Sequence, residues 1–243
     1  MVLSKAKLKE LCAYRQQKRQ DEDGVFIVEG PKMAAEALSS GFTIRTVCHT
    51  GEFSGMAGET AETYEVTPTE LERLSLMRTP NQIWMLVERK TPEIQEEHAQ
   101  LILALDHIQD PGNMGTMMRT ADWYGIRHIV CSRGTVSCYN PKVVQASMGA
   151  VFRTRVDYVD LPQWLASCGM PIFGASLHGE PLTTTNQPPA RKALLIGNES
   201  RGISPEAMAL VTHPVLIPNR GGTAESLNAA VAAAILMDKL VGC

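Results

Sequence analysis

Three polar residues lie between a short apolar strand near the C-terminus and the apolar helix that is expected after it. The stretch "IPNRGGTAESLNAAVAAAIL" (217–236) passes through a Gly-Gly loop and then places Glu225, Ser226 and Asn228 before a series of Ala, Val, Ile and Leu residues. The first N–H groups of a helix need partners from outside it, and a hydroxyl or an acid there supplies them. We therefore expect Ser226 or Thr223 to cap this helix and Glu225 to lie at the positive end of its dipole.

Asn228 needs a separate explanation. Every other residue from 227 to 237 is apolar, which predicts a helix that is buried on all sides. A buried amide without a hydrogen bond costs about 1–3 kcal/mol, so Asn228 must have a partner. The candidates are the backbone, Glu199 and a bound ligand.

A second glycine-containing loop follows another apolar strand in "LLIGNESRGIS" (194–204). Gly197 and Gly202 have nearly the spacing of a phosphate-binding P-loop. The lysine that would meet the phosphates is replaced by Ile203, and Glu199 would place a negative charge where a polyphosphate would bind. A nucleoside-triphosphate-binding enzyme is therefore disfavoured.

A third polar loop opens the stretch "DHIQDPGNMGTMMRTADWYG" (106–125). Residues 110–112, Asp-Pro-Gly, predict a turn, and Asn113 is a suitable N-cap for the helix that follows. Arg119 lies six residues further along, inside that helix. It is either a functional cation or the partner of Asp122 or another nearby acid on a solvated helix face. The glycines of this loop do not form the GxGxxG dinucleotide motif.

Continuous apolar strands precede these loops throughout the second half of the chain. Helical stretches separate most of them, a pattern that predicts a parallel sheet covered on both faces. Ligands of such sheets bind beyond the carboxyl ends of the strands, which is where the polar loops lie. The expected strands are "LILALDHI" (101–108), "RHIVCS" (127–132), "PIFGAS" (171–176), "ALLIG" (193–197) and "PVLIP" (214–218).

Residues 1–90 predict a separate, smaller α/β domain. Apolar residues at near-helical spacing from Leu3 to Tyr14 predict a first helix, and strands and helices then alternate up to "QIWMLVER" (82–89). The polar, acidic stretch 91–100 is the expected linker to a second domain at 101–243.

Composition narrows the classes of protein. Of the 243 residues 44% are hydrophobic and 20% charged, as in a globular protein, and no run approaches the ~18 apolar residues of a membrane span. No secretory signal is evident, so we expect a cytoplasmic protein. The six cysteines form no CxxC pair and indicate neither a zinc site nor a disulfide framework. Residues 1–20 carry six Lys or Arg against one Glu, and could contact phosphates or form a solvated helix face.

Taken together, "NMGTMMRTA", "LLIGNESRGIS" and "IPNRGGTAESLNAAVA" resemble the three ordered motifs of the SpoU/TrmH family of RNA 2'-O-methyltransferases, in the SPOUT superfamily. The resemblance covers residues 101–243, with "ASMGAVFR" (146–153) similar to a segment between the first two motifs. Residues 1–90 are similar to the α/β substrate-binding domain of many members, which is related to RNA-binding ribosomal proteins.

The resemblance implies a parallel-sheet α/β domain with a deep trefoil knot, S-adenosylmethionine as the cofactor, and a homodimer that binds RNA without a metal. It implies a catalytic set carried over by motif position: Asn113, Arg119, Glu199, Ser226 and Asn228. It also implies a set that contacts the cofactor: Gly197, Asn198, Ile217 and Leu227. The loop 219–225 is one residue longer than in many members, so cofactor contacts within 219–224 do not carry over.

The implied reaction is methyl transfer to a ribose 2'-hydroxyl, with ribosomal RNA favoured over transfer RNA. Because a guanidinium stays protonated, we expect Arg119 to hold a phosphate and stabilise the developing alkoxide, with Glu199 as an alternative base. The alternative function is a catalytically silent RNA-binding or ribosome-assembly factor on the same fold. A base methyltransferase is disfavoured by the ribose-type motifs.

Overall fold

The computed structural model describes residues 2–51, 61–93, 100–182 and 189–241. The chain forms two compact units, Met1–Thr91 with Tyr139–Phe152 and Pro92–Cys138 with Arg153–Cys243. Each unit is described by itself below. Within the described ranges, every helix is too short or too polar to cross a membrane.

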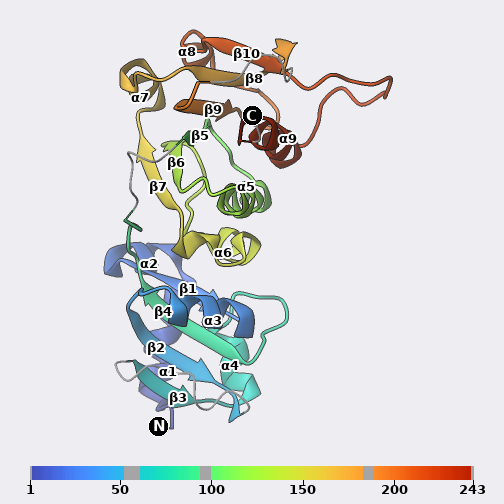
Figure 1. Ribbon diagram of the computed structural model, residues 1–243. Helices are drawn as coiled ribbons and strands as arrows, with labels where there is room; N and C mark the ends of the chain where they lie inside the picture. The colour runs from blue at the N-terminus through green and yellow to red at the C-terminus, as the bar shows by residue number, and fades with distance from the viewer. Residues whose placement is uncertain (1, 52–60, 94–99, 183–188, 242–243) are drawn as a thin grey trace. The chain divides into compact units, whose positions relative to one another are not determined.

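A four-stranded sheet in the order β1-β4-β2-β3 forms the centre of the first unit (Figure 1). Strand β4 is antiparallel to β1 and β2, whereas β2 and β3 are parallel. The elements of this unit are α1 (Lys5–Cys12), the 3-10 turn η1 (Ala13–Arg15), α2 (Gln17–Asp23), β1 (Val25–Glu29), α3 (Pro31–Ser39), β2 (Ile44–His49), β3 (Glu62–Glu65), α4 (Pro68–Leu74), β4 (Ile83–Glu88), α6 (Pro141–Ser147) and the 3-10 turn η4 (Ala150–Phe152).

The expected first helix is divided into two by the turn η1. Gln16 has an extended backbone, and α2 then ends at Gly24, whose φ of 63° suits glycine. The basic residues of this segment are largely engaged within the unit. Lys7 forms ion pairs with Glu10 and Glu62, and Arg19 pairs with Asp23.

Both faces of the first sheet are covered. Side chains of α1 and α4, including Leu11 and Leu74, pack with Trp84 on one face. On the other face Phe26 is fully buried, with its ring centroid 4.7 Å from that of Tyr139 and 6.0 Å from that of Phe152. Residues 139–152 thus complete the core of the first unit, although they lie within the stretch 101–243 that the sequence assigns to the second domain.

The second unit is built on a six-stranded sheet in the order β10-β8-β9-β5-β6-β7, and all five strand pairs are parallel. This confirms the predicted parallel sheet. Strand β7 was missed because its residues are only partly buried and it lacks a continuous apolar run. The elements are β5 (Leu101–Leu105), α5 (Pro111–Trp123), β6 (His128–Ser132), β7 (Arg155–Val159), α7 (Leu161–Ser167), β8 (Ile172–Pro181), β9 (Lys192–Ile196), α8 (Pro205–Met208), β10 (His213–Leu216) and α9 (Ala229–Val241).

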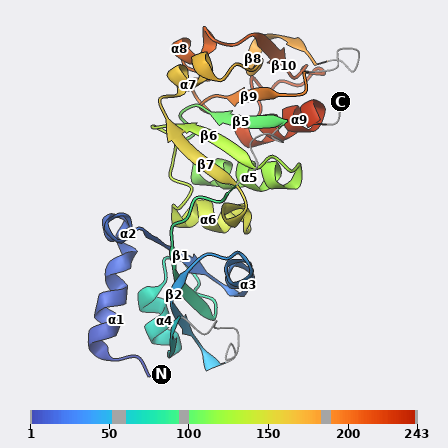
Figure 2. The ribbon, with the colours of Figure 1, turned by 60° about the vertical axis from the view of Figure 1, so that its left-hand side comes forward.

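Helices cover this sheet in two layers. Leu161 and Leu165 of α7 and Ala207 of α8 pack on one face against alternate residues of the central strands, including Ala104 and Leu195. Helices α5 and α9 lie side by side on the other face (Figure 2). The fold is therefore the α/β arrangement expected from the apolar strands, and it brings the loops after β5, β9 and β10 to one edge of the sheet.

Candidate functional site

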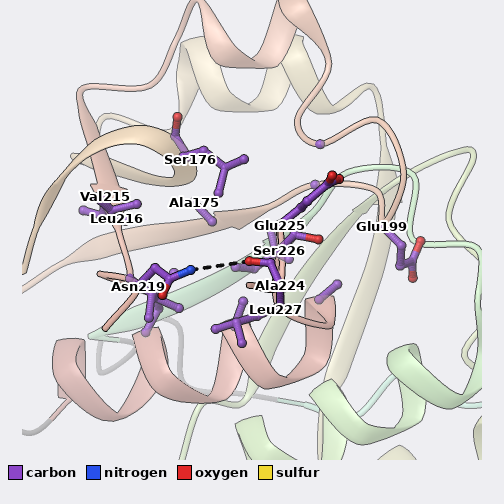
Figure 3. A pocket seen from close by; sticks show the side chains of 18 of the residues that line it. Ala175, Ser176, Glu199, Val215, Leu216, Asn219, Ala224, Glu225, Ser226 and Leu227 are labelled. Carbon is purple, nitrogen blue, oxygen red and sulfur yellow. Dashed lines mark hydrogen bonds between the residues drawn. The ribbon is translucent and has the colours of Figure 1, made fainter. Parts of the chain in front are cut away.

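A cavity of about 1070 Å³ opens at the carboxyl ends of β9 and β10 and beside the middle of β8 (Figure 3). Its walls come from residues 175–177, 196–202, 215–220, 222 and 224–227 and from the first turns of α9. This is the edge at which parallel sheets bind ligands, as the positions of the polar loops predicted. Of the expected site residues, six line the cavity: Gly197, Asn198, Glu199, Ile217, Ser226 and Leu227.

The loop 197–202, which forms part of the cavity lining, has a tightly folded main chain. The backbones of Asn198 and Gly202 exchange two hydrogen bonds of 2.9 Å, which fold the loop back on itself. A Cβ atom on Gly197 would lie 2.1 Å from the nitrogen of Ile203, far inside van der Waals contact. Gly197 is therefore required by the close approach of two chain segments rather than by its φ angle.

Asn198 uses both ends of its amide to hold the loop. Its Oδ1 accepts hydrogen bonds from the backbone nitrogens of Ser200 and Arg201, at 3.0 and 3.1 Å. Its Nδ2 donates to the carbonyl of His107 at 2.8 Å and to Oε2 of Glu199 at 3.3 Å. The side chain thus links the loop after β9 to the loop after β5 and holds the carboxylate of Glu199.

A second chain of hydrogen bonds reaches Glu199 from the start of α9. Oδ1 of Asn228 accepts from the backbone nitrogens of Ala230 and Val231, at 2.9 and 3.3 Å, and its Nδ2 donates to Oδ1 of Asn113 at 2.9 Å. Nδ2 of Asn113 in turn donates to Oε1 of Glu199 at 2.8 Å. Helix N–H groups can only donate and an ionised carboxylate can only accept, so both amides have a single satisfied orientation.

The caps of the two site helices differ from the sequence expectation. Asn228, and not Ser226 or Thr223, caps α9, and Asp110, and not Asn113, caps α5. In the second case the backbone nitrogen of Asn113 donates to Oδ1 of Asp110 at 2.7 Å. Helix α5 begins earlier than expected, at Pro111, and α9 begins later, at Ala229. Because Asp110 caps α5, the side chain of Asn113 is free to donate to Glu199.

Helix α9 is not buried on all sides, which corrects a further expectation. One face, which includes Ala233 and Met237, is buried, whereas Val231 is 48% exposed and residues 220–228 are all exposed. The helix covers only one face of the sheet, and its outer side has no neighbour among the described residues of the unit. The amide of Asn228 is accordingly exposed, and its partners are the helix N-terminus and Asn113 instead of a buried group.

Arg119 lies outside the cavity lining and is exposed. The expected alternative pairing with Asp122 is wrong, because Asp122 accepts hydrogen bonds from Arg127 and Arg153. Across the described residues Arg119 has no hydrogen bond or ion pair. Six positions along α5 turn it about 240° around the helix axis from Asn113, toward the side that also carries Trp123.

Asn219 organises the loop that contains the extra residue. Its Oδ1 accepts from the backbone nitrogens of Gly221 and Gly222, at 2.9 and 2.7 Å, and its Nδ2 donates to the carbonyl of Gly222 at 3.0 Å. Gly221 has a φ of 100°, which favours glycine. Asn219 also donates to the carbonyl of Ala224 at 3.4 Å, so one side chain that lines the cavity holds the whole loop (Figure 3).

Asp106 was not identified from the sequence as a site residue, and the structure places it between the loops after β5 and β9. Its Oδ2 accepts from the backbone nitrogen of Ser204 at 2.8 Å, and its Oδ1 lies 2.7 Å from Nδ1 of His107. Burial opposes its ionisation, but these hydrogen bonds outweigh burial and hold the pKa of the carboxyl below its usual value. An acidic residue directly after an apolar strand was the sequence signal that could have identified Asp106.

Two protein families match successive parts of the chain. Residues 100–238 match the SpoU rRNA Methylase family, and residues 5–84 match the MRM3-like substrate binding domain. The 23S rRNA (guanosine(2553)-2'-O)-methyltransferase RlmP of Bacillus subtilis is 31% identical over 97% of this chain and 96% of its own. The 23S rRNA (uridine(2479)-2'-O)-methyltransferase of Streptomyces viridochromogenes is 28% identical over 90% of this chain and 83% of its own.

A solved structure shares the whole fold. The AdoMet-bound rRNA methyltransferase from Sinorhizobium meliloti has a TM-score of 0.84 and 27% identity, and covers 98% of this chain and 96% of its own. The resemblance read from the three motifs is confirmed by the family match over more than half of the chain and by these full-length relatives. The chain belongs to the SpoU rRNA Methylase family.

Proposed function

We propose that this protein transfers a methyl group from S-adenosylmethionine to a ribose 2'-hydroxyl of ribosomal RNA. The observation that carries the proposal is the hydrogen-bonded chain from Asn228 through Asn113 to Glu199, which ends at the rim of the cavity. It joins all three motifs of the family at one point. The relatives' substrates support ribosomal RNA over transfer RNA.

The cavity suits this cofactor. Its volume is at the upper end of the ~300–1,000 Å³ typical of ligand pockets, and Leu216, Leu227 and Leu236 supply apolar walls for a nucleoside. Glu199 and Glu225 line it as well. Acids attract a sulfonium cation and repel a triphosphate. When bound, the cofactor supplies a methyl group that is already activated by the sulfonium.

The protein's main contribution is then to position the ribose. Glu199 is held from two sides, by Asn113 and Asn198, so its carboxylate presents a fixed acceptor at the cavity rim. Such an acceptor can orient the 2'-hydroxyl in line with the methyl group or take its proton. Ser226 lines the same cavity and offers a hydroxyl.

The alternative function is a catalytically silent RNA-binding factor. A silent protein has no need for the hydrogen bonds that orient Glu199, and every residue of the expected catalytic set is present. A catalytically silent protein would still bind RNA, so methyl transfer must be measured directly.

Two measurements test the proposed function. Calorimetric titration with S-adenosylmethionine is expected to show binding, and ribosomal RNA incubated with protein and cofactor is expected to gain one mapped 2'-O-methyl group. RNA binding without methylation would favour the silent factor, and absence of cofactor binding would exclude the class of enzyme.

Exchange of Asn228 for Asp separates its two roles. Asp is as good an N-cap as Asn, so α9 keeps its cap and the free energy of unfolding is expected to change by less than about 0.5 kcal/mol. The donor to Asn113 is replaced by an acceptor, which disorganises Asn113 and Glu199. We expect kcat to fall by about 10²-fold, comparable to the loss of one positioned group.

Asn228→Ala is the matched variant for the cap. It removes both roles and is expected to lower stability by about 1 kcal/mol as well as kcat. Wild-type turnover in Asn228→Asp would show that the chain of hydrogen bonds has no part in catalysis.

Arg119 is proposed to act on the substrate and not on the cofactor. It has no partner among the described residues and does not line the cavity. Arg119→Ala is therefore expected to leave stability and cofactor affinity unchanged while kcat falls by about 10²–10³-fold, because a cation that stabilises a developing alkoxide is lost. Arg191→Ala, which removes another exposed arginine of the same unit, is the control and should have near-normal kcat. A cofactor affinity that fell together with kcat would contradict this role.

We further infer a homodimer through the outer face of α5 and α9. Trp123 is 85% exposed and Val231 and Val241 are 48% and 38% exposed, and Tyr124 donates to Oδ1 of Asp238 at 2.9 Å across the two helices. An exposed tryptophan on an apolar helix pair is typical of an interface. A second copy on this face would bring Arg119, one helical turn before Trp123, to the boundary between subunits.

Trp123→Glu tests the dimer. The introduced charge is expected to weaken self-association by at least about 30-fold, because a central aromatic contributes 2 kcal/mol or more to an interface. Sedimentation equilibrium of the wild type should give twice the mass of the 26.6 kDa chain, and the variant should give one chain mass with unchanged cofactor affinity. An unchanged mass in the variant would place the interface elsewhere.

Residues 1–90 are proposed to bind the RNA and 101–243 to hold the catalytic site, joined by the linker 91–100. Because Lys7 and Arg19 are paired with acids, phosphate contacts are expected to come from other cations of the first unit, such as Lys5 and Lys9. The trefoil knot belongs to this proposal too. Its support is the fold shared with the rRNA methyltransferase structure from Sinorhizobium meliloti.

A further inference from the structure

His107 has a backbone conformation that few residues other than glycine adopt. Its φ is 55°, in the left-handed region, and it lies in the loop that follows the central strand β5 and Asp106. Such conformations cost on the order of 1–3 kcal/mol and are kept where the surrounding structure requires them. The result is that the side chain, between the buried residues Asp106 and Ile108, turns out to the surface and is 54% exposed.

Asp106 fixes the orientation of the imidazole. Its own side chain is only 3% exposed, and its two oxygens face Nδ1 of His107 at 2.7 Å and the nitrogen of Ser204 at 2.8 Å. Because the backbone of Ser204 can only donate, Asp106 stays in place whatever the state of the ring. Nδ1 of His107 carries a proton toward this carboxylate. Nε2 faces away and has no hydrogen-bond partner within the described ranges.

The backbone of His107 contacts a residue that holds Glu199. The carbonyl of His107 accepts from Nδ2 of Asn198, the same atom that donates to Glu199. On its other side the ring packs against Gly134, where a Cβ atom would lie 2.4 Å from Cδ2 of the imidazole. The glycine in the turn after β6 thus leaves the space that the ring occupies.

Arg133 precedes this glycine and adds a cation to the same edge. Its side chain is exposed and, within the part of the chain that the structure describes, it has no acidic partner. Strands β9, β5 and β6 are neighbours, and adjacent strands are about 5 Å apart. The loops that carry Glu199, His107 and Arg133 therefore succeed one another along one edge at roughly that spacing.

We propose that His107 and Arg133 bind the RNA backbone beside the ribose that Glu199 receives. The protonated imidazole holds Asp106 through Nδ1 and donates Nε2–H to a phosphate oxygen, and the Arg133 guanidinium contacts the same or the adjacent phosphate. This inference rests on the proposed function. It assigns the carboxyl edge of β5 and β6 to the substrate strand, next to the cavity at β8 to β10.

His107→Asn is the variant that tests it. Asn tolerates the left-handed backbone better than other non-glycine residues, so the loop and its carbonyl contact with Asn198 are retained while the imidazole is lost. We expect RNA affinity to fall by about 10-fold, the worth of a hydrogen bond to a charged group. The slope of log K against log salt is expected to decrease in magnitude by about 0.7. Cofactor affinity and kcat at saturating RNA should stay within about twofold.

Two further variants complete the experiment. Arg133→Gln is expected to weaken RNA binding and the salt slope in the same way. His178→Asn removes another exposed histidine of the same unit and should change neither.

Unchanged RNA affinity and salt slope in His107→Asn would overturn the inference. A loss of cofactor affinity as large as the loss of RNA affinity would also overturn it, because His107 would then act only by holding the loop after β9. If the wild type bound RNA but did not methylate it, the proposed function would fail while the RNA-binding comparison could still be made.

Discussion

The start of α9 and the carboxylate of Glu199 are joined by two asparagine amides, and the rest of the site depends on that connection. One end of the chain is a pair of helix N–H groups, which only donate, and the other end is a carboxylate, which only accepts. Between them Asn228 and Asn113 each use one oxygen and one nitrogen. Neither amide can flip without placing two donors or two acceptors together. Three segments far apart in sequence are therefore held in one arrangement.

The parallel sheet was predictable because its strands are buried on both faces and therefore read as continuous apolar runs. The same reasoning placed the polar loops at one edge, and the motifs within them identified the family. Glu199 and Ser226 were thereby located at the cavity before any contact was known. Strand β7 was not predicted, because Arg155 and Asp157 interrupt its apolar pattern. These two side chains pair with each other at 2.8 Å.

Side-chain partners were not predictable, for a physical reason. Spacing along a helix indicates which residues share a face, but it does not show where a loop ends and the first turn begins. A shift of a few residues moved the caps to Asp110 and Asn228 and changed the role of each asparagine. Arg119 could not be assigned from its neighbours either, because Arg127 and Arg153, from outside its own helix, take the acid that it was expected to pair with.

The contact between Gly197 and Ile203 has a consequence for how this cavity can change. A side chain at Gly197 would collide with the main chain of Gly202 and Ile203, so this part of the lining can change only if the backbone moves. The loop around Asn219 also lines the cavity but is exposed, so substitutions there need not displace the backbone of the loop after β9. Changes in ligand preference are therefore expected to arise in this outer loop first.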